Sequence, residues 1–341
     1  MAQQNVLLVG GAGAQGVPIV QALSSDSKYS IRVLTRNPDS ETAKALLKLP
    51  NVSLIQGDAS TEADLRNAFK DIDLAFVNTN SSALGIRSEI FWGTRIFEIA
   101  VQSGVKHYVW SALEDAMLLS GYDEACRVGH YEGKSRVTNW MKSRPQEPMK
   151  WSVITTGPYV EMLHELLRPE REEDGTWVFK YPLKDGAVPF VHLEDVGKGV
   201  KWLFDHPEEA AGFNLKMSVE HASGETLVKA FETITGQPAR YESISTEDWI
   251  ATGGPGPKDH RIGSFHPGNT ADDPTALTIG ENFGNWWHLY QRSAGNKGLL
   301  RADYEWLDKN LPDRVTSVEE WMRKVGYTGE RRNVLKNYNG R

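Results

Sequence analysis

A cluster of small residues near the N-terminus is the clearest chemical feature of the sequence. An apolar run ends at Val9, and Gly10-Gly11-Ala12-Gly13-Ala14-Gln15-Gly16 follows it before a stretch of helical period begins. Glycines allow positive φ and let backbone N–H groups approach a pyrophosphate closely, while a helix N-terminus favours negative charge. The position after a strand and before a helix predicts a dinucleotide-binding turn rather than an ordinary turn without a ligand.

Arg36 follows the second predicted strand, in Thr35-Arg36-Asn37. A site for NAD usually has Asp or Glu at this place, about 20 residues on, to bind the ribose hydroxyls. An arginine suits a 2′-phosphate instead, because a charge-assisted hydrogen bond contributes about 1.5 to 3 kcal/mol, roughly 10- to 150-fold in affinity. We therefore predict NADP(H) rather than NAD(H). The alternative is that Arg36 is only a solvated surface residue.

Polar residues also follow the third and fourth predicted strands. We expect Asp58 and Ala59 to lie near the adenine, and Asn78, Thr79 and Asn80 to line the ribose and pyrophosphate. These residues also have a plain alternative, because Asp, Asn and Thr are common in turns.

Short apolar and β-branched runs alternate with longer segments of helical period over residues 5–155. This alternation is typical of βαβ units, whose right-handed crossovers build a parallel sheet. We therefore predict an α/β fold with a Rossmann-type doubly wound parallel sheet. The predicted strands are 5–9, 31–35, 52–55, 74–78, 107–110 and 151–155, and the predicted crossover helices are 16–24, 41–49, 62–69, 86–103 and 129–142.

The pattern changes after residue 157, where two units interleave. We predict a Rossmann domain over 1–157, to which 189–215 add a further strand and helix, and a smaller α+β C-terminal domain over 158–188 and 216–341. The later elements are predicted as strands at 177–179, 189–191 and 240–244 and helices at 193–204, 224–235, 281–293, 299–310 and 317–325, the last with a capping box of Ser317 and Glu320.

Composition narrows the class of protein. The 341 residues are 40% hydrophobic and 24% charged, which excludes disorder, collagen and coiled coil. Their 38 Lys and Arg against 45 Asp and Glu give a net charge of −7, which disfavours direct nucleic-acid binding. Apolar runs are far shorter than the roughly 18 residues that span a bilayer, and the N-terminus lacks the basic region of a signal peptide. We expect a soluble cytoplasmic protein without membrane contact, or a nuclear one if it acts as a regulator.

Several segments together resemble the NmrA-like family of atypical short-chain dehydrogenase/reductases. The resemblance covers most of the chain and implies a Rossmann domain with a smaller C-terminal domain, with the nicotinamide end of the cofactor and any substrate in the cleft between them. Members include reductases and proteins that bind NADP(H) as redox sensors and regulate a partner such as a transcription factor. The segments are Gly10, Gly13 and Gly16, Gly57-Asp58, Ala75-Phe76-Val77-Asn78-Thr79, Gly157-Pro158-Tyr159 and Val191-His192-Leu193-Glu194-Asp195-Val196-Gly197.

The superfamily pattern implies a catalytic Ser, Tyr and Lys, with the Tyr and Lys four residues apart on one helix face. This chain departs from the pattern: His130 takes the place of the tyrosine, Lys134 that of the lysine, and Ser111 that of the serine. We expect Lys134 to hydrogen-bond the nicotinamide ribose and to lower the pKa of a neighbouring acid, unless it is a surface lysine. Tyr131 and Tyr159 are alternative proton donors, and each also has a plain packing role.

His130 is expected to be mostly neutral at pH 7, because its reference pKa is about 6.5 and Lys134 lies one helical turn away. A neutral imidazole donates a proton less readily, so His130 is either a weak acid in catalysis or not catalytic. We place Gly157, Pro158 and Tyr159 beside the cofactor, together with Ser111 and Lys134.

Other kinds of site are disfavoured. The nine histidines contain no His-Glu-x-x-His motif and Cys126 is the only cysteine, so we expect neither a metal site nor a disulfide, and Cys126 to be a small buried residue. A Gly-x-Ser-x-Gly elbow is also missing. The segment 253–275, rich in Gly, Pro and Asp and holding His260, Arg261 and His266, is a candidate lid over the cleft.

Five tryptophans fall in the C-terminal portion. They predict either the core of a small domain or an aromatic wall for a flat substrate or a partner. They are Trp249, Trp286, Trp287, Trp306 and Trp321.

Two functions follow from these residues and from the resemblance. The first is an NADP(H)-dependent reductase that transfers hydride from NADPH to a carbonyl, imine or activated alkene of a small, bulky or aromatic organic substrate. The second is a non-catalytic NADP(H) redox sensor that regulates a protein partner such as a transcription factor. The expected partners are accordingly a small-molecule substrate or a regulatory protein, with a homodimer as a further option.

Overall fold

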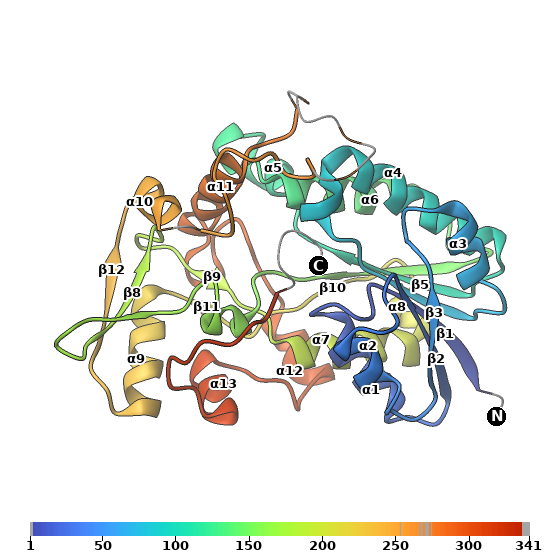
Figure 1. Ribbon diagram of the computed structural model, residues 1–341, viewed down its shortest axis with the longest axis horizontal. Coiled ribbons are helices and arrows are strands. Elements are labelled where there is room, and N and C mark those ends of the chain that lie inside the picture. Colours follow the sequence, from blue (N-terminus) through green and yellow to red (C-terminus); the bar gives the residue numbers. More distant parts are fainter. Residues whose placement is uncertain are drawn as a thin grey trace.

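A seven-stranded sheet is the main element of the structure (Figure 1). The computed structural model describes residues 3–252, 254–264, 266, 269, 273 and 275–335. All neighbouring strands of this sheet run parallel, so their carboxyl ends meet at one edge. The strand order is that of the Rossmann fold, which confirms the predicted fold class. In spatial order the strands are β10 (Asn214–Lys216), β6 (Lys150–Thr155), β5 (His107–Ala112), β4 (Leu74–Val77), β1 (Gln4–Val9), β2 (Tyr29–Thr35) and β3 (Val52–Gln56).

The two faces of the sheet have separate hydrophobic cores. Val6 and Leu8 of β1 pack into one cluster of buried side chains, and Leu7 and Val9 pack into the other. Successive strand residues point to opposite faces, and here both faces are covered, so the central strands are apolar throughout.

Helices cover these faces in two layers (Figure 1). Buried residues of α1 and α7 share a cluster with one face, and buried residues of α3, α4 and α6 share a cluster with the other. The first layer contains α1 (Gly16–Ser24), α2 (Glu41–Leu46) and α7 (Leu193–Asp205), and the second contains α3 (Glu62–Ala68), α4 (Ser81–Gln102) and α6 (Gly129–Met141).

Helix α4 differs from the prediction at its start. The sequence predicted a helix from Ile86, whereas α4 begins at Ser81 and contains a kink at Gly85, whose φ is +70°. A positive φ is unfavourable for residues with a Cβ, so glycine is required at this bend. The predicted helix therefore corresponds to the part of α4 after the kink.

The seventh strand of the sheet is not the predicted one. The sequence predicted it at 189–191, but β9 (Val188–Pro189) pairs antiparallel with β11 (His221–Ala222) in a separate small sheet. The seventh strand is β10, which pairs with β6. It was missed because three residues with one apolar side chain, Leu215, carry no strand pattern.

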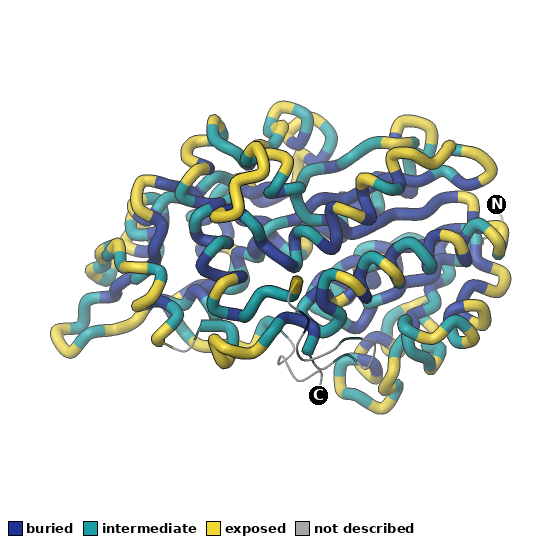
Figure 2. The backbone as a smooth tube through the Cα atoms, turned by 90° about the horizontal axis from the view of Figure 1, so that it is seen from above, coloured by how far each residue is buried: buried dark blue, intermediate teal, exposed yellow. Residues whose placement is uncertain are grey.

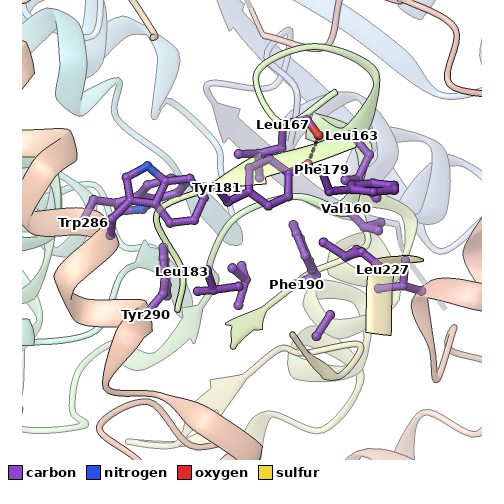
Figure 3. Close-up of a cluster of buried hydrophobic side chains, with 14 of the residues drawn as sticks. Val160, Leu163, Leu167, Phe179, Tyr181, Leu183, Phe190, Leu227, Trp286 and Tyr290 are labelled. Carbon is purple, nitrogen blue, oxygen red and sulfur yellow. Dashed lines mark hydrogen bonds between the residues drawn. The ribbon is translucent and has the colours of Figure 1, made fainter. Parts of the chain in front are cut away.

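The C-terminal part of the chain surrounds a third hydrophobic core. Figure 3 shows Phe179, Leu227 and Trp286, from β8, α9 and α11, in this cluster. Four of the five C-terminal tryptophans are buried in it, which confirms the core prediction for them over the aromatic wall; Trp306 packs on the core of the sheet instead. The elements here are β7 (Glu170–Arg171), β8 (Trp177–Tyr181), β12 (Ala239–Ser243), α9 (Gly224–Thr235), α10 (Thr246–Ala251), α11 (Ile279–Gln291) and α13 (Val318–Val325).

Short helices connect these parts. The helix predicted from Leu299 begins only at Tyr304, and the predicted capping box is half formed: the Ser317 side chain accepts the Glu320 N–H, but the Glu320 carboxylate accepts the N–H of Thr316. The short helices are α5 (Ala116–Ser120), η1 (Glu124–Cys126), η2 (Val160–His164), α8 (Pro207–Ala210), η3 (Ala294–Asn296) and α12 (Tyr304–Asn310).

Burial follows this layered arrangement, with buried segments through the centre of the molecule and exposed segments at its periphery (Figure 2). Cys126 is free and buried, as predicted. Among the described residues, no helix is long and apolar enough to cross a membrane.

Candidate functional site

The glycine turn follows β1 at the carboxyl edge of the sheet. Gly10 has a φ of +84°, and a Cβ on it would lie 2.5 Å from the carbonyl oxygen of Asn78. A Cβ on Gly16 would lie 2.3 Å from the carbonyl oxygen of Gly10. Both distances are too short for non-bonded atoms, so the close packing of β1, β4 and α1 requires glycine at these places.

The outer side of the turn has more room. A Cβ on Gly13 would have one neighbour within 4 Å, the Gly10 carbonyl oxygen at 3.2 Å. Gln15 is the N-cap residue of α1, but its side chain accepts no hydrogen bond from the N–H groups of the first turn, and that turn contains no acidic residue. The turn thus presents backbone and the positive end of the α1 dipole, which fits the pyrophosphate of a dinucleotide.

Gln15 connects the ends of three other strands. Its Oε1 accepts hydrogen bonds from Asn78 Nδ2 at 3.1 Å and from Ser111 Oγ at 2.7 Å. Its Nε2 donates to Thr156 Oγ1 at 3.1 Å and to the Tyr159 hydroxyl at 2.9 Å. A single buried amide therefore holds together residues that follow β4 and β6 and one in β5.

Lys134 lies beside this network. Its side chain comes from α6 and is buried, and its Nζ donates to Asn78 Oδ1 at 3.0 Å, Thr79 Oγ1 at 3.3 Å and the Ser111 carbonyl oxygen at 3.2 Å. The ammonium also lies 4.9 Å from the ring centroid of Trp110. The structure thus brings Lys134, Ser111, Asn78 and Thr79 together at the carboxyl edge of the sheet, as the sequence predicted, and shows that Lys134 is not a surface lysine.

Glu89 of α4 is the residue of this site that the sequence did not reveal. Its Oε1 lies 3.3 Å from Lys134 Nζ, and its side chain has no exposed surface. Burial lowers the pKa of Lys134, and the adjacent Glu89 carboxylate opposes that effect. The sequence feature that could have pointed to Glu89 is Gly133 on the facing helix α6, because a Cβ at this position would lie 2.5 Å from Glu89 Oε2.

The predicted adenosine-end residues lie along the same edge with different surroundings. Arg36 is exposed, and within the described part of the chain its guanidinium makes no hydrogen bond or ion pair. The Asp58 carboxylate accepts hydrogen bonds from the N–H and hydroxyl of Ser60, as in an ordinary turn. Ala59 packs against the core beneath α3 and α4, and Asn80 caps α4 by accepting the Ala83 N–H at 3.3 Å.

His130 is held by the C-terminal region. The Nδ1 atom of its half-buried ring lies 3.0 Å from the Asn282 amide nitrogen. The ring also stacks on the Phe283 ring, and the two ring centroids are 5.5 Å apart. Asn282 also accepts the backbone N–H of Gly129, so α11 caps α6 from outside. Burial lowers the pKa of His130 to about 4, which makes the ring neutral at pH 7, as the sequence argument expected.

The two tyrosines considered as proton donors are placed differently. The Tyr131 hydroxyl is buried and lies 2.6 Å from the Tyr290 hydroxyl, in the C-terminal core and outside the hydrogen-bond network of Lys134. Tyr159, a partly buried residue, follows Gly157 and Pro158 after β6, and its hydroxyl accepts a hydrogen bond from Gln15. Burial raises the pKa of Tyr159 to about 12, so its hydroxyl stays protonated at pH 7.

A small cavity lies next to this network, between the ends of β6 and β10 and the segment before α12. Thr156 and Gly157 form one side of it and Leu300 and Arg301 form another. Lys216 also lines it, and its ammonium pairs with Glu114 at 2.7 Å. A more open groove lies between α1 and α7, where Lys201 pairs with Asp26 and Asp205.

The candidate lid lies partly outside the described residues, because 253, 265, 267–268, 270–272 and 274 are not described. Its described part contacts the start of α4: Gly263 N–H donates to the Ser82 carbonyl oxygen at 3.0 Å, and Ser88 donates to Asn269 at 2.7 Å. The described residues Gly263 and Asn269 therefore lie against the helix that begins after Asn80. Among the described residues, no group of three or more His, Cys, Asp or Glu could hold a metal ion.

Sequence comparisons with known proteins point to one family. The model of the NmrA-like family matches residues 2–253. The NmrA-like family domain-containing oxidoreductase malD of Malbranchea aurantiaca is 26% identical over 338 residues, which cover 94% of this chain and 96% of malD.

Solved structures show the same fold. NmrA, a negative transcriptional regulator, has a TM-score of 0.71 at 19% identity in its complex with NAD, over 95% of this chain and 96% of that one. Its complex with NADP gives 0.63 at 22% identity, over 72% and 75%. An NADPH-dependent quinone oxidoreductase of Escherichia coli, in complex with NADPH, gives 0.68 at 17% identity, over 94% and 100%.

Proposed function

Since the chain belongs to the NmrA-like family, we propose that it is an NADP(H)-dependent oxidoreductase acting on a carbonyl, imine or activated alkene of a small, bulky or aromatic organic molecule. One observation carries this proposal: the buried Lys134 ammonium lies at the ends of β4 and β5, beside the Gln15 network and across from the glycine turn. Doubly wound folds bind and act on ligands at the carboxyl edge of the sheet, and Lys134 and its polar neighbours lie at this edge.

The chain offers a holder for each part of the cofactor. The turn from Gly10 to Gly16 would bind the pyrophosphate, because its outer side is open and α1 starts without an acidic residue. Arg36 is exposed and unpaired among the described residues, so its guanidinium is free to bind the 2′-phosphate that distinguishes NADP(H). Lys134 would bind the ribose next to the nicotinamide. Of the solved structures named above, NmrA holds NADP in one complex and NAD in another, and the quinone oxidoreductase holds NADPH.

The reaction needs a hydride and a proton. When bound, NADPH supplies the hydride. Tyr159 is the proton donor that the geometry favours, because its hydroxyl accepts from Gln15 and so keeps its own hydrogen for a substrate oxygen or nitrogen. Lys134, connected to Tyr159 through Asn78 and Gln15, would stabilise the tyrosinate that forms. His130 is less suited, since Asn282 holds it against the C-terminal core, and the Tyr131 hydroxyl is paired with the Tyr290 hydroxyl, although Tyr131 lines the neighbouring cavity.

The substrate would enter the cavity between β6, β10 and the segment at Leu300. Thr156, which accepts a hydrogen bond from Gln15, lines this cavity. Apolar side chains such as Met217 and Leu300 also line it, beside the ion pair of Glu114 and Lys216. The cavity has about 20 Å³ of internal space, room for one water molecule, so an apolar ring with one polar group would bind here only if the walls move apart. We accordingly assign 1–157 with 189–215 to cofactor binding and 158–188 with 216–341 to the substrate or partner, although Leu307 of α12 packs on the core of the sheet.

A second candidate function is a redox sensor without turnover. It is favoured by His130, which occupies the expected tyrosine position yet has a pKa of about 4 and is held by Asn282. Under this proposal, the oxidised and reduced cofactors bind with different affinity and change the fit of a protein partner.

Calorimetric titration with NADPH, NADP⁺, NADH and NAD⁺ in one buffer tests cofactor binding. We expect NADPH to bind more tightly than NADH, and absence of binding to all four would refute both candidate functions. Binding of the oxidised forms as tight as that of NADPH would favour the sensor.

Turnover is then measured with a panel of aldehydes, ketones, quinones, imines and enones. We expect activity that Tyr159→Phe reduces by at least 100-fold and that Lys134→Met abolishes. The matched control is Lys142→Met, which removes an exposed lysine from the end of the same helix. Tight NADPH binding without turnover of any compound would leave the sensor as the better proposal.

A further inference from the structure

Glu89 is a fully buried carboxylate with no role in the functions described so far. It comes from α4, just after the kink at Gly85. Its Oε1 accepts hydrogen bonds from the hydroxyls of Thr79 at 2.6 Å and Ser81 at 2.8 Å, and it pairs with Lys134 at 3.3 Å. One oxygen atom thus joins the segment after β4, the start of α4 and the lysine of α6.

The other carboxylate oxygen is enclosed without a partner. Glu89 Oε2 is buried and, within the described residues, makes no hydrogen bond. It faces α6 at Gly133, where a Cβ would lie 2.5 Å away. The burial of a charged carboxylate opposes folding unless it is paired, and a well-packed apolar residue would serve stability as well or better. Stability alone therefore does not account for a carboxylate at this place.

The charges around Lys134 show what Glu89 does. The remaining partners of its Nζ, from Asn78, Thr79 and Ser111, are neutral oxygens. His130, four residues earlier on α6, is neutral at pH 7. Among the described residues of α4, β4, β5 and α6, Glu89 is thus the anionic group that faces the Lys134 ammonium.

We propose that Glu89 is a positioning residue for Lys134: it keeps the buried ammonium charged and holds it, through Thr79 and Ser81, in line with the segment that would contact the cofactor ribose. This inference rests on the proposed function, since it assigns Lys134 its working state. Burial favours the neutral amine, which would leave one donor fewer and no charge for a bound cofactor or for the Tyr159 hydroxyl.

The isosteric substitution Glu89→Gln tests this. Gln keeps an acceptor for Thr79 and Ser81 and removes the negative charge. We expect the pH midpoint of Lys134 titration, followed through its side-chain resonances in lysine-labelled protein and assigned with Lys134→Met, to fall by at least one pH unit, which is a tenfold change in its proton affinity. The pH at which NADPH affinity is lost should fall by the same amount, whereas Glu89→Asp should restore much of the original midpoint.

The control is Ser81→Ala, which removes a hydrogen bond to Glu89 and leaves the charged pair. We expect it to leave the Lys134 midpoint unchanged. If Glu89→Gln folds and weakens NADPH binding equally at all pH values with an unchanged Lys134 midpoint, Glu89 has only a structural role and the proposal is wrong.

A second measurement applies if Glu89→Gln folds poorly. Lys134→Met leaves the Glu89 carboxylate buried and unpaired, so the double variant with Glu89→Gln should be more stable than Lys134→Met alone in urea denaturation. Equal or lower stability of the double variant would overturn the charge pairing. Neither the titration nor the denaturation requires a cofactor, so absence of NADP(H) binding refutes the proposed function without obscuring these results.

Discussion

Two glycines of the same turn are expected to respond to alanine in opposite ways. A Cβ on Gly16 would lie 2.3 Å from the Gly10 carbonyl oxygen and 2.4 Å from the Gly11 Cα, both backbone atoms that no side-chain rotation can move. A Cβ on Gly13 would meet one atom within 4 Å, at 3.2 Å. Gly16→Ala therefore disturbs the packing of the turn, and Gly13→Ala adds a methyl group to the side that would face the pyrophosphate.

The expected magnitudes follow from these distances. Overpacking typically costs about 1 to 3 kcal/mol, and the rigid backbone around Gly16 places Gly16→Ala at the upper end of that range. Gly13→Ala needs a shift of a few tenths of an ångström and should change the free energy of unfolding by less than about 1 kcal/mol. Its methyl group keeps the phosphate away from the backbone N–H groups, so NADPH affinity should fall at least tenfold, about 1.4 kcal/mol.

The assay combines urea denaturation with calorimetric titration of NADPH. The matched control is Gly280→Ala in α11, where a Cβ would lie 3.3 Å from the Lys258 carbonyl oxygen and 3.4 Å from the Lys258 Cβ, contacts outside the site and no closer than the one at Gly13. We expect it to match Gly13→Ala in stability and to keep wild-type affinity. Wild-type NADPH binding by Gly13→Ala, or wild-type stability of Gly16→Ala, would refute the assignment of the turn.

Three further outcomes are expected. Arg36→Gln should lower NADPH affinity by roughly 10- to 150-fold and leave NADH affinity unchanged; an unchanged ratio of the two would exclude a 2′-phosphate contact. His107 is buried beside Ser152, and burial lowers its pKa to about 4, below the 6.5 of the unfolded chain. Folding favours the neutral form of His107, so the stability that depends on this form is present above pH 6.5 and is lost as the pH falls toward 4. Urea denaturation should show that the free energy of unfolding falls by about 2 kcal/mol between pH 7 and pH 5, and by less in His107→Gln. Saturating NADPH should slow proteolysis within 253–275 if this segment closes over the cleft, and unchanged cleavage there would exclude the lid.

Local pattern was sufficient to predict six of the seven strands of the main sheet. Strands β1 to β6 lie within two residues of their predicted bounds, because short β-branched runs between turns identify buried parallel strands without reference to distant residues. The turn from Gly10 to Gly16 was equally visible, since its role depends on backbone freedom next to one strand and one helix. Strand β10 escaped prediction, and β9 was expected in the wrong sheet, because the place of a short strand depends on the neighbour that it pairs with.

The sequence by itself determined which side chains gather at one edge, because parallel strands place every segment that follows them on the same side of the sheet. This is why Lys134, Ser111, Asn78 and Tyr159 could be expected together. Only the tertiary structure decided how they pair: Glu89 with Lys134, Gln15 with four neighbours, and Tyr131 with Tyr290, 159 residues away. The physical reason is that residue type and period set which face a side chain takes, whereas its partner depends on how closely two helices approach, as α4 and α6 do at Gly133.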